Sequence, residues 1–443
     1  MNERRAFPPS KLRPYQKAPL INPSTIAALA RASPVSDLPM AFDWRNPDDV
    51  AKRLGPVNSK KFSLMTPVDQ GGCGNCWACC TATALTDRAN IKLITDGKQT
   101  IDLLSINFLT ECGDLCLYPN NPDDTQNGCM LGCNGSDLGT SFTFLTKTLS
   151  GGMTPNSCNP WVTPPHVSEQ DVGTLDPDIQ FRLYETKERP CQNSLWTKEC
   201  ADTMKQCREC NNIPNNDSDF RVFVQKDSVK LMKDSTTIKQ EVYLNGPVGA
   251  AFQIFQDFQS KSSSNESFIN PPYQESQGIY IQETDDSTNP PEGFHAVVIV
   301  GWGSKKIQIP GQSGPPIEVP YWIVRNSWGT SWGTGGYWMH AMANPSQNIN
   351  MESAMEGVFS GQYDGAGGVI SFLPEFKGKQ DAIKAANDIV AIQNEENNDN
   401  AARRNEAKKR SDAQQSAAKV PWTLIIIIVA IVIGIIGVFI AMR

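Results

Sequence analysis

The segment TPVDQGGCGNCWACCTATALTDR, residues 66–88, contains Gln70, Cys73, Cys76 and Trp77 in the spacing Q-x-x-C-x-x-C-W. The small and apolar residues that follow Cys76 predict a buried helix that begins at this cysteine. A thiol at a helix N-terminus lies at the positive end of the helix dipole, which raises its thiolate fraction. Gln70 carries an amide that can donate a hydrogen bond to a developing oxyanion. The segment therefore predicts a nucleophilic cysteine at position 76.

Three histidines, His166, His295 and His340, are the candidates for the proton-transfer partner of this thiol. His295 lies in GFHAVVIVGWG, a small-residue approach to a segment that predicts a buried strand. Asn326 follows another β-prone segment, and its amide can hold the second imidazole nitrogen of His295. Trp328 can shield that hydrogen bond from water. We interpret His166 and His340 as loop or surface histidines.

The cysteine, histidine and Asn-Ser-Trp-Gly segments, in this order, resemble those of the papain family of cysteine proteases. The resemblance implies an α+β, papain-like two-lobed fold, in which a helical lobe carries Cys76 and a β-barrel-like lobe carries His295 and Asn326. It implies that Cys76 is the nucleophile and His295 its acid/base partner. Asn326 would orient His295, and Gln70 would complete an oxyanion hole with the backbone amide of Cys76.

The chain departs from the family pattern at two points around the nucleophile. Asn75 precedes Cys76, where the family signature has Ser or Ala. The separation of Cys76 and His295 is 219 residues, whereas about 130–150 is usual. We therefore expect a large insertion in the middle of the peptidase domain.

Several segments resemble the cathepsin B-like branch of the family: LPMAFDWRN, LNGPVGAAFQIFQDF and SCNPW. We expect Cys79 and Cys80 to be small apolar residues of the buried helix. The resemblance implies that the other cysteines pair as Cys73–Cys133, Cys112–Cys207, Cys158–Cys210 and Cys191–Cys200, with Cys116 and Cys129 closing a short loop.

The resemblance also suggests which residues contact substrate: Gly135, Ser136, Ala296, Trp328 and Ala354. The turn at Gly135 and Ser136 keeps the backbone groups that bind an extended peptide. Ala354 stands where the cathepsin B-like branch has an acidic residue, which favours an apolar P2 side chain. The loop between Cys191 and Cys200 contains no histidine, so endopeptidase activity is expected in place of carboxydipeptidase activity.

Leu424 to Met442 is a run of 19 residues without a charged or polar side chain, long enough to span a lipid bilayer as a helix. Basic residues are concentrated before this run, and one arginine follows it. The N-terminus has no apolar segment typical of a signal peptide. These features predict a tail-anchored, single-pass membrane protein with its peptidase domain on the cytosolic or virion-interior side.

The predicted disulfides conflict with a reducing cytosol. One hypothesis that resolves the conflict is a large DNA virus that forms disulfides in its own virion proteins; a reduced domain and a lumenal domain are the alternatives.

We divide the chain into an N-terminal extended arm or short prosegment (1–37), a papain-like peptidase domain (38–376), a polar stalk (377–419) and a transmembrane anchor (420–443). In the stalk, the spacing of Ile383, Ala386, Ile389 and Val390 is compatible with a short helix, which the tract NEENNDN is expected to interrupt.

The net charge of −7 gives no basic footprint for nucleic acid, and no cysteine–histidine cluster has zinc spacing. We expect no metal, no organic cofactor, and a peptide or protein substrate. A membrane-tethered scaffold that retains a protease fold is the main alternative function, and an acyl transferase of peptidase fold is a second.

Overall fold

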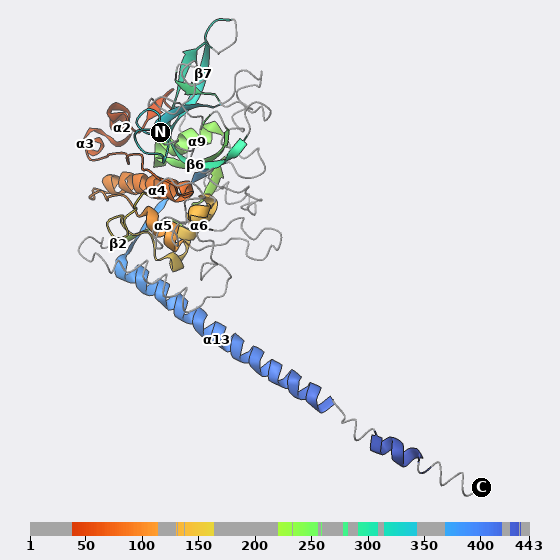
Figure 1. Cartoon of the computed structure of the whole chain (residues 1–443). Coiled ribbons are helices and arrows are strands. Elements are labelled where there is room, and N and C mark those ends of the chain that lie inside the picture. The colour runs from red at the N-terminus through yellow and green to blue at the C-terminus, as the bar shows by residue number, and fades with distance from the viewer. Residues whose placement is uncertain are drawn as a thin grey trace, which may run out of the picture. The chain divides into compact units, whose positions relative to one another are not determined.

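The computed structural model describes residues 38–113, 130, 132–136, 138–163, 220–232, 234–255, 258, 278–281, 291–308, 314–342, 368–418, 426–433 and 435 (Figure 1). The chain forms two compact units, Met1–Ile389 and Val390–Arg443, and each is described by itself. The first unit contains every predicted catalytic residue.

The helix predicted to begin at Cys76 is confirmed as α4 (Cys76–Thr95). Its sequence has no glycine or proline, and its alanines, threonines and cysteines are small enough to let neighbours approach from every side. The helix is accordingly buried around almost its whole circumference. It contacts β4 (Val248–Phe255) and β6 (Pro291–Ile307) as well as α5 (Ile106–Cys112) and α6 (Leu138–Thr146). In Figure 1 it lies between β6 on one side and α5 and α6 on the other.

The other described helices of the first unit are shorter. α2 and α3 each have a proline in their first turn, where the missing N–H leaves no hydrogen bond unmade. Asp234 caps α9 by accepting a hydrogen bond from the backbone amide of Thr237 at 2.7 Å. The bounds are α2 (Pro47–Leu54), α3 (Pro56–Ser59) and α9 (Ser235–Asn245), with 3-10 turns at Gly132–Asn134 and Thr148–Ser150.

Eight of the described strands form one sheet in the order β3-β9-β4-β6-β7-β8-β5, and β1 pairs with β6. All of its pairings are antiparallel except that of β5 with β8. The strands are β1 (Phe42–Asp43), β3 (Lys230–Met232), β4 (Val248–Phe255), β5 (Ile279–Tyr280), β6 (Pro291–Ile307), β7 (Ile317–Arg325), β8 (Tyr337–Ala341) and β9 (Gly368–Ser371). A separate ribbon pairs β2 (Phe220–Val224) with β10 (Pro374–Gly378).

The two faces of β6 belong to different parts of the core, because successive side chains of a strand point in opposite directions. Ala296, Val298 and Val300 pack in the cluster that contains α4. Val297 and Ile299 pack on the other face, in a cluster rich in tryptophan. His295 therefore lies on a strand that is held from both sides.

A buried ion pair joins α4 to the end of β7. Asp87 and Arg325 approach to 2.8 Å, with side-chain exposures of 0% and 1%. Met65 completes the arrangement, because its N–H donates to Asp87 Oδ1 and its carbonyl accepts from Arg325 Nη1, each at 2.8 Å. Burial raises the pKa of Asp87, and the Arg325 guanidinium opposes that change. The ion pair is thus fixed by its hydrogen bonds to the backbone of Met65 and is inaccessible to solvent.

Two predictions about the C-terminal region are corrected or left open by the structure. α13 (Lys379–Ala418) runs through the Asn-rich tract without interruption. The propensity cost of Asn and Asp is a fraction of a kcal/mol per residue, which the surrounding Ala, Lys, Arg and Gln outweigh. Within the residues that the structure describes, no helix is long and apolar enough to cross a membrane. Of the predicted anchor Leu424–Met442, only residues 426–433 and 435 are described.

We expect Asp87→Asn to reduce the free energy of unfolding by about 3–5 kcal/mol, because Arg325 then remains charged and buried without its partner. Urea denaturation would measure this loss. Asp388→Asn, which removes an exposed carboxylate that pairs with Lys384 on α13, should change stability by less than about 1 kcal/mol. Equal losses of unfolding free energy for the two substitutions would contradict a stabilising role of the buried Asp87–Arg325 ion pair.

Candidate active site

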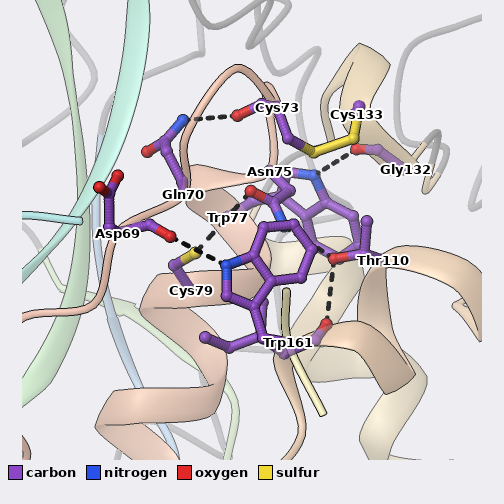
Figure 2. The surroundings of a disulfide bond; sticks show 11 residues. Asp69, Gln70, Cys73, Asn75, Trp77, Cys79, Thr110, Gly132, Cys133 and Trp161 are labelled. Carbon is purple, nitrogen blue, oxygen red and sulfur yellow. Dashed lines mark hydrogen bonds between the residues drawn. A yellow bond between two sulfur atoms is a disulfide. The ribbon is translucent and has the colours of Figure 1, made fainter. Parts of the chain in front are cut away.

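The loop before α4 is held by a disulfide between Cys73 and Cys133, whose Cα atoms are 4.7 Å apart (Figure 2). This is the pair that the family resemblance implies. Gly74 N–H donates to the Cys133 carbonyl at 3.0 Å. A Cβ atom at Gly74 would lie 2.4 Å from that carbonyl oxygen, so the close approach requires glycine. The nucleophile loop is therefore fixed to the segment that precedes Gly135.

Asn75, where the family signature has a smaller residue, ties the nucleophile loop to α5. Its side chain is fully buried and donates from Nδ2 to Thr110 Oγ1 at 2.9 Å. Its Oδ1 accepts a long hydrogen bond from Cys79 Sγ at 3.8 Å (Figure 2). The side chain makes no capping bond to the helix. Sequence reasoning identified Asn75 only as a departure from the pattern, since the position of Thr110 becomes known only in the fold.

Gln70 is held in place from the opposite half of the site. Its Nε2 donates to the Cys73 carbonyl at 2.8 Å, and its Oε1 accepts from Ser327 Oγ at 2.6 Å. Its backbone N–H donates to the Ser327 carbonyl at 2.8 Å. A glutamine amide has two N–H donors, so the second one can serve an oxyanion. Ser327 was missed as a positioning residue, although it lies within the quoted Asn-Ser-Trp-Gly segment.

His295 and Asn326 are brought together by the pairing of β6 with β7. His295 Nε2 lies 2.7 Å from Asn326 Oδ1, which also accepts the Ser327 N–H at 2.8 Å. Because Oδ1 accepts, Nε2 carries the proton in the neutral ring, and Nδ1 has the free lone pair. Nδ1 is buried and makes no hydrogen bond to a residue that the structure describes. The ring of Trp328 lies against the imidazole, with centroids 4.8 Å apart.

The sulfur of Cys76 lies beside the peptide that follows His295. Ala296 N–H donates to Cys76 Sγ at 3.4 Å. Cys76 and His295 are both fully buried, and Gln70, Asn326 and Trp328 are nearly so. Thiol, imidazole and amide thus come from α4, β6 and the end of β7, and they are the groups that a thiolate mechanism requires.

His340 is a correction, because it is buried and does not lie on the surface. It lies on β8, within an aromatic cluster, and its Nδ1 accepts a hydrogen bond from Trp338 Nε1 at 3.3 Å. The ring contacts the edges of Phe252 and Tyr280 at centroid distances of 5.3 and 5.1 Å. Trp338, Ala341 and Met342, which flank His340 in GGYWMHAMA, belong to the core, and that apolar pattern was a signal for burial. His166 lies outside the described residues.

The remaining predicted residues are placed only in part. Gly135 has a φ of +103°, which favours glycine, and Ser136 is buried. Cys112 and Cys158 are disulfide-bonded. Outside the described residues lie Ala354 and the cysteines Cys116, Cys129, Cys191, Cys200, Cys207 and Cys210.

Burial lowers the pKa of both described histidines, to about 4 for His295 and about 3 for His340. The hydrogen bond with Asn326 opposes this shift at His295. A lowered pKa means that the unfolded chain binds more protons than the folded one below about pH 6.5. The stabilising contribution of each neutral imidazole is therefore present at pH 7 and is lost as the pH falls from about 6.5 toward 4.

We expect His340→Gln to reduce the loss of stability between pH 7 and pH 4.5 by about 2–3 kcal/mol relative to the unmodified chain. Glutamine keeps an acceptor for Trp338 but does not titrate. Urea denaturation at the two pH values would measure the difference. The same loss of unfolding free energy in both proteins would show that His340 does not contribute to the pH dependence of stability.

Comparisons with known proteins agree with this geometry. The family model "Papain family cysteine protease" matches residues 38–357. A cathepsin B-like cysteine proteinase of Schistosoma japonicum is 25% identical over 306 residues, covering 68% of this chain and 67% of that protein. Cathepsin B-like cysteine proteinase 1 of Ostertagia ostertagi is 28% identical over 317 residues, covering 68% and 71%.

Among solved structures, proCathepsin B S9 from Trypanosoma congolense matches with a TM-score of 0.42 and 20% identity, covering 82% of each chain. The match of the family model over most of the chain decides the family. This protein belongs to the papain family of cysteine proteases, with cathepsin B-like relatives at modest identity, and is a cysteine peptidase of α+β fold.

Proposed function

We propose that the protein is a membrane-anchored cysteine endopeptidase. The observation that carries the catalytic part is the 2.7 Å contact between His295 Nε2 and Asn326 Oδ1. This contact leaves the lone pair of Nδ1 to accept the proton of Cys76. The resulting thiolate attacks a peptide carbonyl, and the imidazolium then protonates the leaving amine.

The oxyanion formed in this attack has two donors within the site. One is the second N–H of Gln70 Nε2, since the first donates to Cys73. The other is the backbone N–H of Cys76, the first residue of α4, where backbone amides point out of the end of the helix. A water molecule deprotonated by His295 Nδ1 then hydrolyses the acyl-enzyme.

The endopeptidase assignment rests on the segment between Cys191 and Cys200. In cathepsin B, which this chain resembles, a loop of this kind carries histidines that bind the C-terminal carboxylate of the substrate. The segment QNSLWTKE contains none, so a free carboxylate has no such partner there. Ala354 in place of an acidic residue supports an apolar P2 side chain.

The membrane assignment rests on Leu424–Met442. Its described part, residues 426–433 and 435, is helical, and its large aliphatic side chains are about half exposed. Exposed isoleucine and valine in such a run are favourable in hydrocarbon and unfavourable in water. Basic residues precede the run, which supports a peptidase domain on the cytosolic or virion-interior side: Arg403, Arg404, Lys408, Lys409, Arg410 and Lys419.

We expect the purified chain to cleave peptides internally and to react with an epoxide thiol probe at Cys76. Cys76→Ala should reduce cleavage by more than about 10³-fold and abolish labelling, because the nucleophile is removed. A peptide library read by mass spectrometry would give the cleavage sites and the P2 preference. A scaffold without activity would show equally slow labelling of both proteins and no cleavage, and transfer to an added amine in preference to water would indicate an acyl transferase.

Ser327→Ala should lower kcat by about tenfold with little change in KM, because Gln70 loses one neutral hydrogen bond that fixes its amide. Steady-state kinetics on one peptide would measure the change. Ser304→Ala is the matched control, since that hydroxyl bonds to Glu318 on an exposed part of β6 and β7. A rise in KM alone would mean that Ser327 supports substrate binding and leaves the oxyanion hole unaffected.

We expect the full chain to float with lipid vesicles after alkaline extraction. Ile433→Lys, at the centre of the apolar run, should weaken insertion by about 2–3 kcal/mol, whereas Ile392→Lys on an exposed face of α13 should not. Digestion of the peptidase domain from the cytosolic side of intact membranes would support the proposed topology. Full protection without detergent would contradict it.

A further inference from the structure

The first turn of α4 carries two buried thiols that the hydrolytic mechanism does not use. Cys79 and Cys80 are 1% and 2% exposed and lie outside any disulfide. Together with Cys76 they form the sequence Cys-Trp-Ala-Cys-Cys at the N-terminus of the helix. A Cys-x-x-Cys pair at a helix N-terminus is an arrangement suited to reversible oxidation.

The two thiols point in different directions. Cys79 Sγ donates to Asn75 Oδ1 at 3.8 Å, toward the end of the helix where Cys76 lies (Figure 2). Cys80 Sγ donates to the Val297 carbonyl at 3.0 Å, toward β6. The direction of its side chain therefore favours Cys79 as the partner of Cys76.

The separation of Cys76 and Cys79 is compatible with a disulfide after a small movement. Residues three apart on a helix have Cβ atoms about 5–6 Å from each other, whereas a disulfide needs about 3.5–4.5 Å. The movement of about 1–2 Å falls on the first turn, where the amides of Ala78 and Cys79 donate to the carbonyl of Asn75, the residue before the helix. Closing the pair would pull the sulfur of Cys76 away from the Ala296 N–H.

A small cavity lies beside Cys79 and Cys80. It is lined by Cys79, Cys80 and Ala296, with Asn326 and Ser327 on the side of the catalytic base. Its size suits at most about one water molecule. Cys76 is not among its described lining residues, so a hydroperoxide reaches Cys76 by the path that the peptide substrate takes in the proposed mechanism.

We propose that Cys79 is the resolving thiol of a reversible redox pair with the nucleophile Cys76. A hydroperoxide oxidises Cys76 to a sulfenic acid and is itself reduced to water or an alcohol. The Cys79 sulfur then bonds to the sulfenic sulfur while its proton passes to the departing hydroxide, which leaves as a second water, and a Cys76–Cys79 disulfide forms. A dithiol reverses the step by thiol–disulfide exchange and becomes a disulfide itself.

This pairing makes peptidase activity dependent on the redox state and protects the nucleophile from irreversible oxidation. It rests on the proposed function, because Cys76 must be the reactive thiol. Burial raises the pKa of the Cys79 thiol, so Cys79 remains protonated and is not itself the first target of the oxidant.

The test uses the full chain with graded hydrogen peroxide, followed by alkylation, peptide mapping by mass spectrometry, and activity before and after a dithiol. The unmodified chain and Cys80→Ser should show a Cys76–Cys79 link and recover most of their activity. Cys79→Ser should instead accumulate sulfinic acid at Cys76 and recover at least about tenfold less activity. The same map checks that Cys73–Cys133 stays intact.

A Cys76–Cys80 link, or equal recovery of Cys79→Ser and the unmodified chain, would overturn the proposal. The mass readout does not depend on proteolysis, so the two proposals can fail separately. If Cys76 is alkylated rapidly but never joins Cys79, only the redox pairing fails. If Cys76 is neither alkylated nor oxidised, the assignment of Cys76 as nucleophile fails first.

Discussion

The buried ion pair of Asp87 and Arg325 sets the position of the two halves of the active site relative to each other. Asp87 lies about three turns along α4 from Cys76, and Arg325 directly precedes Asn326. Because the two side chains are almost completely buried, water cannot solvate either charge if the ion pair separates, so separation is costly. The backbone of Met65 bonds to both side chains. The helix that carries the nucleophile is thereby held in register with the strand that ends at the orienting amide.

Each half of the site is completed by groups from the other half. Gln70 precedes α4, but Ser327 beyond β7 holds its side chain and its backbone N–H. The sulfur of Cys76 accepts its hydrogen bond from Ala296 on β6. The loop around Asp69 pairs with Trp328 in a short antiparallel bridge. The proposed oxyanion donor, nucleophile and base are consequently preorganised together, which is the condition for electrostatic stabilisation of a transition state.

The parts of the site that could be predicted are those whose residue type and local pattern already specify a role. The helix beginning at Cys76, the His295 strand and the Asn326 segment are of this kind, and the family match confirms the α+β papain-like fold. The roles of Ser327 and Asn75 could not be read from the chain, because they depend on partners 257 and 35 residues away.

Two errors of interpretation have different physical origins. The expectation that His340 is a loop or surface residue is wrong because β8 places it among Phe252, Tyr280 and Trp338. The expectation that the tract NEENNDN interrupts a helix is wrong because weak propensity over a few residues does not end a helix of 40 residues. Tertiary burial decided the first case, and the length of the helix decided the second.

The burial of His295 explains how a closed site can still transfer a proton. A lone imidazolium is disfavoured there, which is why its pKa falls to about 4. In the proposed mechanism, proton transfer from Cys76 creates thiolate and imidazolium together, so the net charge of the site does not change. The attraction between the two charges offsets part of the cost of burying each one, and the Asn326 carbonyl oxygen stabilises the imidazolium at Nε2. Ionisation of Cys76 and His295 as a pair therefore avoids the single buried charge that the low pKa of His295 shows to be unfavourable.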